Sequence, residues 1–448
     1  MCLLNFAIYL GYLVAVVSSQ NYNEDETYQY MSDLSKYEVF RGDVRDFQFN
    51  DGVDRTPVQL WILHRHGTRL PGAGEIKNLE SLPTFTDEII KNHENGKGTL
   101  TDFQIEKLKQ WTFDSSISEI PYYLTQEGYN ETYRTASRFK QRFPELLNKE
   151  YSEEDFYFQH SDTERTLKTS YAFIDALFGD NAESYVNDVV WPSNSDYLLY
   201  PFGGACAKLT ERLSSPNSYV DANAFLRTDA ANQAIESISE RLGFNETLSV
   251  DYIPTFFEAC AYDTAWNQES QPLGAWCPAL GAEGRPIGEY FSDLQFLAMS
   301  GYGNAVNERS GCATPQDLWE RFATATGELN VEGKNQTVTA LFSHDNLIML
   351  VLTSLGLNKD DPITSSDNYA IQANRKWRTS KIVPFAANIA AVLFEVQKRG
   401  ATEYEVLFLN NEKPLEGIPN CPGGICSWED FKAFVQPVAD GCKFDDIC

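Results

Sequence analysis

Three times along this chain, a short apolar segment typical of a β-strand runs directly into a polar cluster and then into a helical pattern. Segment 58–63 (VQLWIL) leads into HRHGTRLPG, segment 156–159 (FYFQ) into HSDTERT, and segment 338–342 (VTALF) into SHDN. In an open α/β sheet, ligands bind beyond the carboxyl ends of the strands. The pattern therefore predicts an α/β fold, with a central sheet flanked by helices, whose functional site is built from these three clusters.

The rest of the chain divides by composition and periodicity. We expect an acidic, loosely held lead-in over 20–54, followed by one domain over 55–448 whose α/β core comprises about 55–72, 150–182 and 331–448. Helical windows such as ANQAIESISERLGF and PQDLWERFATAT predict a mostly helical inserted subdomain, over about 73–149 and 183–330. No Pro-, Gly- or Ser-rich linker separates independent domains.

The N-terminus predicts secretion. Residues 1–19 carry no charged side chain, are mostly apolar and end in Ser18 and Ser19, which is typical of a cleaved signal peptide. A transmembrane anchor is the alternative, but the apolar run is slightly short for a membrane span. We expect a secreted, extracellular protein with no membrane partner after cleavage.

Cysteine usage agrees with an oxidising compartment. Cys2 would leave with the signal peptide, and the even set that remains suits four disulfides. No Cys-x-x-Cys spacing occurs, so zinc-ribbon and thioredoxin-like sites lack their residues. Three sequons predict glycosylation. The cysteines are Cys206, Cys260, Cys277, Cys312, Cys421, Cys426, Cys442 and Cys448, and the sequon asparagines are Asn130, Asn245 and Asn335.

The charge balance excludes one large class of partner. The chain has 64 acidic and 36 basic residues, a net charge of −28. A field of this sign repels nucleic acid and anionic membrane surfaces, so we expect no nucleic-acid partner. Any recognition of phosphate must be local, from arginines clustered in a cleft, because exposed charges beyond about 8 Å are largely screened at physiological ionic strength.

Two hydrolase chemistries are disfavoured by missing motifs, and a third stays as an alternative. There is neither a Gly-x-Ser-x-Gly elbow nor a P-loop. His64 and His66 stand two apart at a strand end and could form a metal-binding pair, which would make the protein a metal-dependent hydrolase. The remaining histidines are His93, His160 and His344, so a binuclear site would need nearly all of them. We therefore expect neither a metal ion nor another cofactor.

The string Arg65-His66-Gly67-Thr68-Arg69 has the chemistry of a phosphate trap. Two guanidiniums flank one imidazole and supply planar, charged forks for phosphoryl oxygens. A neutral imidazole can attack phosphorus and carry it as phosphohistidine, while the arginines neutralise the charge that develops. Gly67 lets the backbone approach the phosphate closely.

These motifs resemble a known family. RHGTRLP resembles the Arg-His-Gly-x-Arg-x-Pro signature of the histidine acid phosphatases, and SHDN at 343–346 resembles their distal His-Asp element. The segments GYGNAVNERSGC, IVPFAANIA and VLFLNNEKPL are similar to the multiple inositol polyphosphate phosphatase branch, so the resemblance spans about 55–448. It implies a histidine phosphatase-like fold and removal of phosphate from phytate and related small-molecule phosphate esters.

The resemblance also implies roles for individual residues. We expect Ser161 and Asp162 to cap the following helix rather than to contact the substrate. If Asp345 is not the proton donor, Glu75 and Glu164 are the carboxylates nearest in sequence to the phosphate-binding motifs that could take its place. The implied roles are His66 as nucleophile, Asp345 as proton donor, Arg65, Arg69, Arg165 and His344 as phosphate ligands, and disulfides Cys260–Cys277 and Cys421–Cys426, with Cys206, Cys312, Cys442 and Cys448 forming two bridges of open pairing.

Two features depart from the inositol polyphosphate branch. That branch usually has His-Ala-Glu where this chain has His344-Asp345-Asn346, as in fungal phytases. The loop 71–75 also lacks the lysine that these phytases often use for secondary phosphates, and only Lys77 follows nearby. The alternatives to an inositol polyphosphate phosphatase are thus a broad-specificity secreted acid phosphatase, a catalytically inactive phosphate-binding module and the metal-dependent hydrolase. The sequence makes no prediction of oligomeric state.

Overall fold

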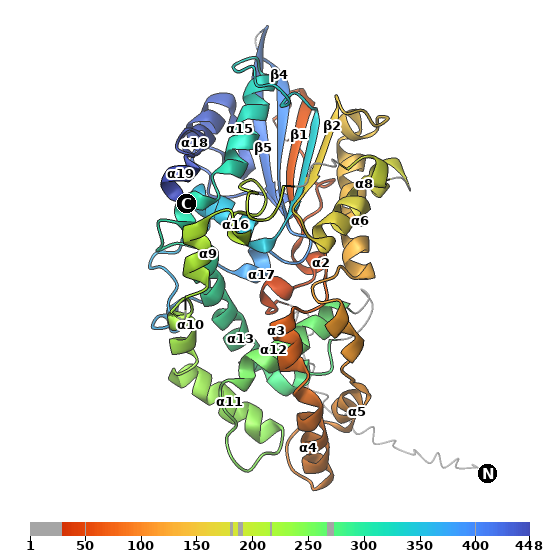
Figure 1. The fold of residues 1–448 in the computed structure, drawn as a ribbon, viewed down its shortest axis with the longest axis vertical. Helices are drawn as coiled ribbons and strands as arrows, with labels where there is room; N and C mark the ends of the chain where they lie inside the picture. Colours follow the sequence, from red (N-terminus) through yellow and green to blue (C-terminus); the bar gives the residue numbers. More distant parts are fainter. Residues whose placement is uncertain are drawn as a thin grey trace, which may run out of the picture.

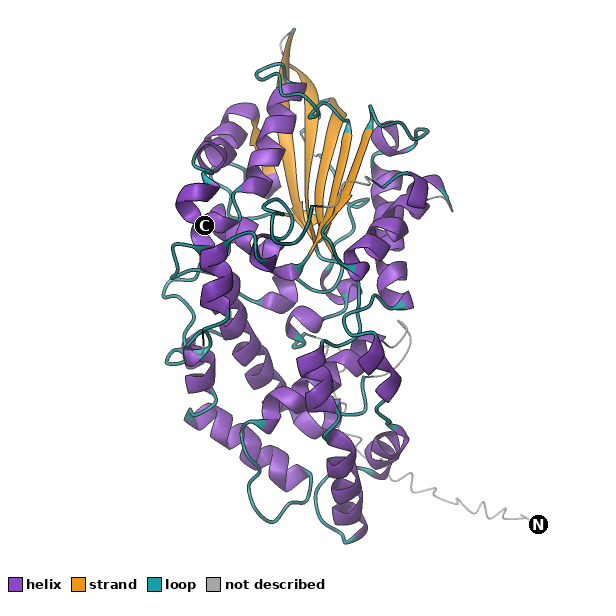
Figure 2. Ribbon diagram, in the orientation of Figure 1, coloured by secondary structure: helices purple, strands orange, loops and turns teal. Residues whose placement is uncertain are grey.

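The structure is a computed structural model that describes residues 29–49, 51–179, 182–186, 191–215, 217–266, 273–398 and 400–448. The expected signal peptide, 1–19, lies outside the described residues. A mixed β-sheet occupies the upper half of the molecule, and the lower half is helical (Figure 2). The strands are β1 (Arg55–Arg65), β2 (Phe156–His160), β3 (Val338–Ser343), β4 (Asn388–Lys398), β5 (Ala401–Asn410), β6 (Lys413–Pro414) and β7 (Ile425–Ser427).

The sheet has the order β2-β3-β1-β4-β5-β6, with β7 paired to β5. β2, β3 and β1 are parallel, whereas β4 is antiparallel to both β1 and β5. The three parallel strands are those that the sequence predicts to lead into polar clusters. Their carboxyl ends consequently lie along one edge of the sheet.

Side chains of β1 alternate between two buried faces. Leu60 and Ile62 pack in a core with the helices α6 (Gln126–Arg142), α7 (Pro144–Leu147) and α8 (Glu164–Phe178). Trp61 and Leu63 pack in a second core with α15 (Ala313–Ala325), α16 (Asp345–Ser354) and α18 (Trp428–Asp440). Figure 1 shows α6 and α8 on one side of the sheet and α15 and α18 on the other. Burial on both faces explains why β1 reads as an unbroken apolar run.

A separate core holds together what we call the helical lobe, which lies below the sheet in Figure 1. Its helices are α3 (Ala73–Leu79), α4 (Leu82–Glu94), α5 (Asp102–Gln110), α10 (Val220–Phe225), α11 (Asp229–Arg241), α12 (Tyr252–Trp266) and α13 (Cys277–Ser300). The remaining helices are α2 (Tyr37–Phe40), α9 (Ala207–Leu213), α14 (Asn307–Ser310), α17 (Thr379–Ile382) and α19 (Phe444–Ile447). Short 3-10 turns include η1 (Ser32–Leu34).

The structure differs from the expected division in two places. Helices α6, α7 and α15 fall within the segments assigned to the inserted subdomain, yet Phe139 and Phe322 pack against the sheet. Helical periodicity shows which face of a helix is apolar, but not which surface covers it. Within the described part of the lead-in, residues 31–44 are packed against the rest of the protein rather than loosely held, because polar groups there have buried partners. Tyr37 is fully buried, for example, and donates to Glu412 Oε1 at 2.9 Å.

Among the residues that the structure describes, four disulfides cross-link the chain, and they include both pairs that the resemblance implies. Cys260–Cys277 joins α12 to α13 in the helical lobe, and Cys421–Cys426 closes a short loop before β7. The other bridges, Cys206–Cys448 and Cys312–Cys442, tie the C-terminal residues to the starts of α9 and α15.

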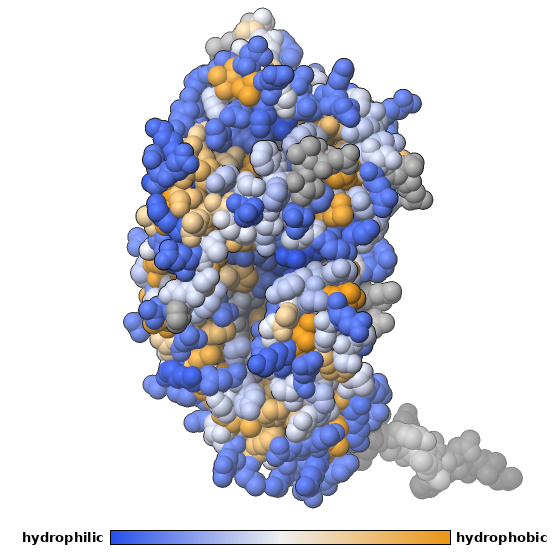
Figure 3. All heavy atoms as spheres, viewed as in Figure 1, coloured by the Kyte–Doolittle hydropathy of each residue, from blue (hydrophilic) through white to orange (hydrophobic). Residues whose placement is uncertain are grey.

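The face shown in Figure 3 is mainly hydrophilic, with a hollow between the sheet and the helical lobe. Of the sequon asparagines, Asn245 and Asn335 are exposed, and Asn130 is half-buried on α6. Among the helices that the structure describes, none combines the length and the apolar character needed to cross a bilayer.

Candidate active site

The three polar clusters meet at one edge of the sheet. β1 ends at Arg65 and β3 at Ser343, and these residues pair directly across the strands. β2 ends at His160, which pairs with Phe342. This register carries the segments that follow each strand to the same place, and it brings together Arg65, His66, Arg69, Arg165, His344 and Asp345.

The loop after β1 is held against the start of α6. A Cβ atom on Gly67 would lie 2.1 Å from the carbonyl oxygen of Gly128, so this backbone contact requires glycine. Thr68 donates to Glu131 Oε2 from both its backbone nitrogen and its hydroxyl, each at 2.9 Å. Burial raises the pKa of Glu131 to about 7. Thr125, which caps α6, donates from its backbone nitrogen to Thr68 O at 2.9 Å.

His66 is held as a neutral imidazole. Its side chain is buried, and Nδ1 lies 2.9 Å from its neighbour's carbonyl oxygen, Gly67 O. Nδ1–H therefore donates, which leaves the lone pair on Nε2. Burial, followed by the charges of Arg65 and Arg165, lowers the pKa of His66 well below its usual range. The imidazole thus stays unprotonated, and nucleophilic, under acidic conditions.

Arg65 is shared between two carboxyl groups. Its Nη2 lies 2.7 Å from Asp345 Oδ2 and 3.2 Å from Asp33 Oδ2, while Nη1 donates to the carbonyl oxygens of Asp33 and Val383. Burial raises the pKa of Asp33 to about 6, although Arg65 opposes this shift. Asp33 belongs to the lead-in, and no sequence motif marks it. It is Asp33, rather than Glu75 or Glu164, that lies beside Asp345.

His344 lies opposite His66, with 5.5 Å between the ring centroids. Arg165 Nη2 donates to His344 Nδ1 at 3.2 Å, so Nε2 carries the proton and faces Ser161 Oγ at 2.9 Å. The expectation that Ser161 and Asp162 cap the next helix is wrong, because Thr163 is the N-cap residue of α8. Ser161 instead orients His344. A serine before a helix has the same pattern in either role, so the sequence could not distinguish them.

Arg69 is fixed by contacts from the helical lobe. Its Nη1 donates to Tyr262 OH at 2.6 Å and to Glu75 Oε2 at 3.1 Å. Burial opposes ionisation of Glu75, but Arg69 outweighs it and lowers the pKa of that carboxyl. The ring of Tyr122 lies 5.3 Å from the guanidinium carbons of both Arg69 and Arg165. Tyr122 and Tyr262 have no sequence signal, because each acts only through a distant arginine.

The arrangement suits a phosphoryl group. The Nε atoms of Arg65 and Arg165 are buried and have no hydrogen-bond partner among the described residues. An unpaired buried donor costs about 1 to 3 kcal/mol, and a bound oxyanion would satisfy it. A cavity of about 240 Å³ adjoins Arg69, and its lining also includes Asp345 and Asn346.

His64 is directed away from this chemistry. Its ring packs against Phe173 and Phe342, and Nδ1 donates to Arg65 O at 2.5 Å. Burial lowers the pKa of His64 to about 4. His64 therefore has the surroundings of a core histidine.

Glu164, one of the alternative proton donors, accepts a hydrogen bond from Leu124 N at 3.0 Å.

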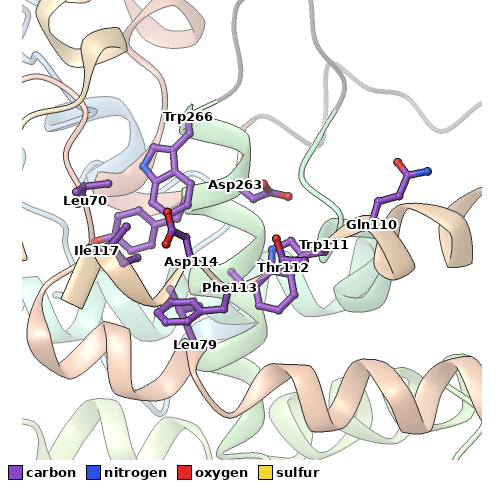
Figure 4. Close-up of a pocket in the computed structure, with 12 residues that line it drawn as sticks. Leu70, Leu79, Gln110, Trp111, Thr112, Phe113, Asp114, Ile117, Asp263 and Trp266 are labelled. Carbon is purple, nitrogen blue, oxygen red and sulfur yellow. The ribbon is translucent and has the colours of Figure 1, made fainter. Parts of the chain in front are cut away.

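A second cavity, of about 400 Å³, is lined by residues of the helical lobe and by Leu70, which follows Arg69 in the chain (Figure 4). Tyr262 and Trp266 of α12 line it, and Trp266 Nε1 donates to Arg69 O at 3.2 Å. Trp111 and Phe113 add two further aromatic rings to its lining. The helical lobe thus supports Arg69 through both its backbone and its side chain.

Comparisons with known proteins agree with this geometry. Residues 58–409 match the model of the histidine phosphatase superfamily, branch 2. The chain is 30% identical over 416 residues to multiple inositol polyphosphate phosphatase 1 of Drosophila melanogaster, covering 91% of this chain and 85% of that protein. It is 24% identical to acid phosphatase PHO1 of Komagataella pastoris, over 87% of this chain and 80% of that protein.

Solved structures show the same fold. The phytase from D. castellii superposes with a TM-score of 0.70 at 17% identity, covering 98% of this chain and 92% of that chain. The multiple inositol polyphosphate phosphatase of Bifidobacterium longum superposes with a TM-score of 0.62 at 13% identity, covering 89% and 96%. The sheet, its flanking helices and the helical lobe are therefore a histidine phosphatase fold. The chain belongs to branch 2 of the histidine phosphatase superfamily, as a hydrolase of the histidine acid phosphatase and phytase family.

Proposed function

We propose that this protein removes phosphate groups from inositol polyphosphates such as phytate, through a phosphohistidine on His66. The observation that carries the chemistry is a neutral imidazole surrounded by three arginines. The relative at 30% identity, named multiple inositol polyphosphate phosphatase 1, supports the substrate class. Arg65, Arg69 and Arg165 hold the phosphoryl oxygens and offset the charge that develops on them.

The reaction has two steps. In the first, the lone pair on His66 Nε2 attacks phosphorus, the bond between phosphorus and the ester oxygen breaks, and Asp345 gives its proton to the leaving alcohol. In the second, a water molecule gives a proton to the Asp345 carboxylate and its oxygen attacks phosphorus. The P–N bond then breaks, and inorganic phosphate and free His66 result.

Substrate binding must rearrange the contacts of Arg65. Asp345 Oδ2 lies 2.7 Å from Arg65 Nη2 in the structure, so a bound phosphate competes with this carboxylate for the guanidinium. A phosphate that takes the place of Asp345 on Arg65 Nη2 frees this carboxyl group to face the leaving oxygen.

A broad-specificity acid phosphatase is the second candidate, and the lining of the cavity favours it. Arg69 is the one cation among the described residues that line this cavity, against the carboxyls of Asp33, Glu75, Glu258 and Asp345. The test is kcat/KM for phytate against that for an aryl phosphate, measured from about pH 4 to 8. A higher value for phytate supports the inositol polyphosphate assignment, and a uniformly higher value for the aryl ester supports the second candidate.

We further propose that the protein matures in the secretory pathway and is secreted. The apolar N-terminus over 1–19, four disulfides and the exposed sequons at Asn245 and Asn335 support this assignment. The half-buried Asn130 is the third proposed glycosylation site. Expression in animal cells should give a protein in the medium whose mass falls on treatment with an N-glycosidase. Retention inside the cell without glycans would overturn the assignment.

A further inference from the structure

One carboxyl group at the site has no place in the reaction described above. Glu258, on α12, lines the same cavity as Arg69 and Asp345. Its Oε2 accepts a hydrogen bond from Asn78 Nδ2 at 3.2 Å. Within the described part of the chain, no lysine, arginine or histidine forms an ion pair with Glu258. It is therefore a carboxyl at the substrate cavity whose direct partner is a neutral amide.

The charged groups that line the cavity with Glu258 come from four other elements, one of which is α16, with Asp345. Glu75 of α3 and Asp33 of η1 are acidic neighbours, and Arg69 of the loop after β1 is the cationic one. The residues of α13 that line the cavity, Ser292 and Gln295 among them, are uncharged. Arg69 already pairs with Glu75 at 3.1 Å, which reduces what it offers to a second carboxylate.

This environment disfavours the ionised form of Glu258. Burial, and then the negative charge of Glu75, raises the pKa of Glu258 to about 8. Below that pH the group is mainly a neutral acid, which can donate a hydrogen bond to a phosphate oxygen. Above it the group is a carboxylate, which repels phosphate. Its change of charge would be felt by any anionic group that enters the cavity.

The position of the cavity determines which substrates meet Glu258. In the proposed reaction the arginines bind the reacting phosphate and the leaving alcohol faces Asp345, a residue that also lines the cavity. A ring that carries further phosphates brings them into this space, whereas a small ester with one phosphate does not. Resting on the proposed function, we propose that Glu258 is a specificity-determining residue, which admits highly phosphorylated rings when neutral and excludes them when ionised.

The experiment compares phytate with glycerol 2-phosphate, which has one phosphate. For each enzyme, kcat/KM for phytate is divided by kcat/KM for glycerol 2-phosphate, at intervals from about pH 5 to 9. Titration of the substrates and of the catalytic groups affects all variants alike, so the comparison between variants isolates Glu258. The control is Glu80→Gln, which removes the same charge from an exposed position at the end of α3.

We expect the wild-type ratio to fall by about tenfold more than that of Glu258→Gln as the pH rises through 8, since a full charge appears near the substrate. Glu80→Gln should follow the wild type. A second variant, Glu258→Lys, should give a ratio above wild type at pH 9. Equal pH dependence in the wild type and Glu258→Gln, or a ratio for Glu258→Lys no higher than wild type, would overturn the proposal.

The outcome is separable from failure of the proposed function. If phytate is not hydrolysed at any pH, the substrate assignment fails, and phytate is then used as a competitive inhibitor of glycerol 2-phosphate hydrolysis. Its inhibition constant should increase with pH in the wild type and change less in Glu258→Gln. No inhibition at pH 5, or the same trend in both enzymes, would reject the role of Glu258.

Discussion

Replacement of Asp345 by asparagine tests the proton donor with little disturbance of the site. Asparagine is isosteric with aspartate and keeps an oxygen that can accept from Arg65 Nη2, which lies 2.7 Å from Asp345 Oδ2. Its amide cannot serve as an acid. The substitution should therefore retain the fold and most phosphate binding, and it should remove proton donation to the leaving group.

The size of the effect depends on the leaving group. A positioned acid contributes about 10² to 10⁴ in rate, or roughly 2.7 to 5.4 kcal/mol. The carboxyl group of Asp33 contacts the same nitrogen, Arg65 Nη2. Because burial raises the pKa of Asp33 to about 6, Asp33 still holds a proton at pH 5. It can partly replace the lost acid, so we expect the lower end of this range, about 100-fold, for phytate at pH 5. Nitrophenolate leaves without a proton, and nitrophenyl phosphate should slow by less than about fivefold.

The assay is steady-state kcat on both substrates for the wild type and Asp345→Asn. A matched control is Asp87→Asn, at an exposed position of α4 in the helical lobe. Equal slowing of the two esters, or none, would refute the role of Asp345. Asp33 would then become the first candidate for the proton donor, and Asp33→Asn would show the selective loss instead.

Three further predictions use other parts of the structure. Burial raises the pKa of Asp33 to about 6, so its ionisation adds a negative charge beside Arg65 as the pH rises. The KM for phosphate esters should therefore increase less from pH 5 to 7 in Asp33→Asn than in the wild type. Parallel KM profiles in the two enzymes would contradict this prediction. Dialysis against EDTA should leave activity within about twofold, because the arginines supply the charge; loss of activity that zinc restores would favour a metal-dependent reaction. Peptide mapping of the unreduced protein should recover Cys260–Cys277, Cys421–Cys426, Cys206–Cys448 and Cys312–Cys442, and free thiols at these positions would disagree.

Much of the site could be predicted from sequence because its residues follow strands. Arg65, His66 and Asp345 stand within a few residues of apolar runs, and parallel strands bring such positions together. The expectation of an α/β sheet flanked by helices is confirmed for the same reason. The string Arg65-His66-Gly67-Thr68-Arg69 itself contains the nucleophile and two of the arginines that we propose to bind phosphate.

The remainder depends on long-range contacts that leave no local pattern. Asp33 is more than thirty residues before Arg65, in a segment whose polarity predicts exposure, yet its carboxyl is buried against that arginine. Glu131 and Tyr262 likewise act on the loop after β1 from α6 and α12. Local hydropathy scores each residue by itself. A polar side chain can be buried when it has a hydrogen-bond partner, and that partner cannot be recognised from the local sequence.

The central claim is that phosphate passes through His66. The most direct measurement is rapid quench of the enzyme during turnover of ³²P-labelled substrate, followed by peptide mapping. Phosphohistidine is stable to alkali and labile to acid, so an alkaline quench should retain label on the peptide that contains His66, and an acid quench should lose it. His66→Ala should carry no label and turn over no substrate, while still binding phosphate through its arginines. Label that survives acid, label on another peptide, or turnover by His66→Ala would contradict the account.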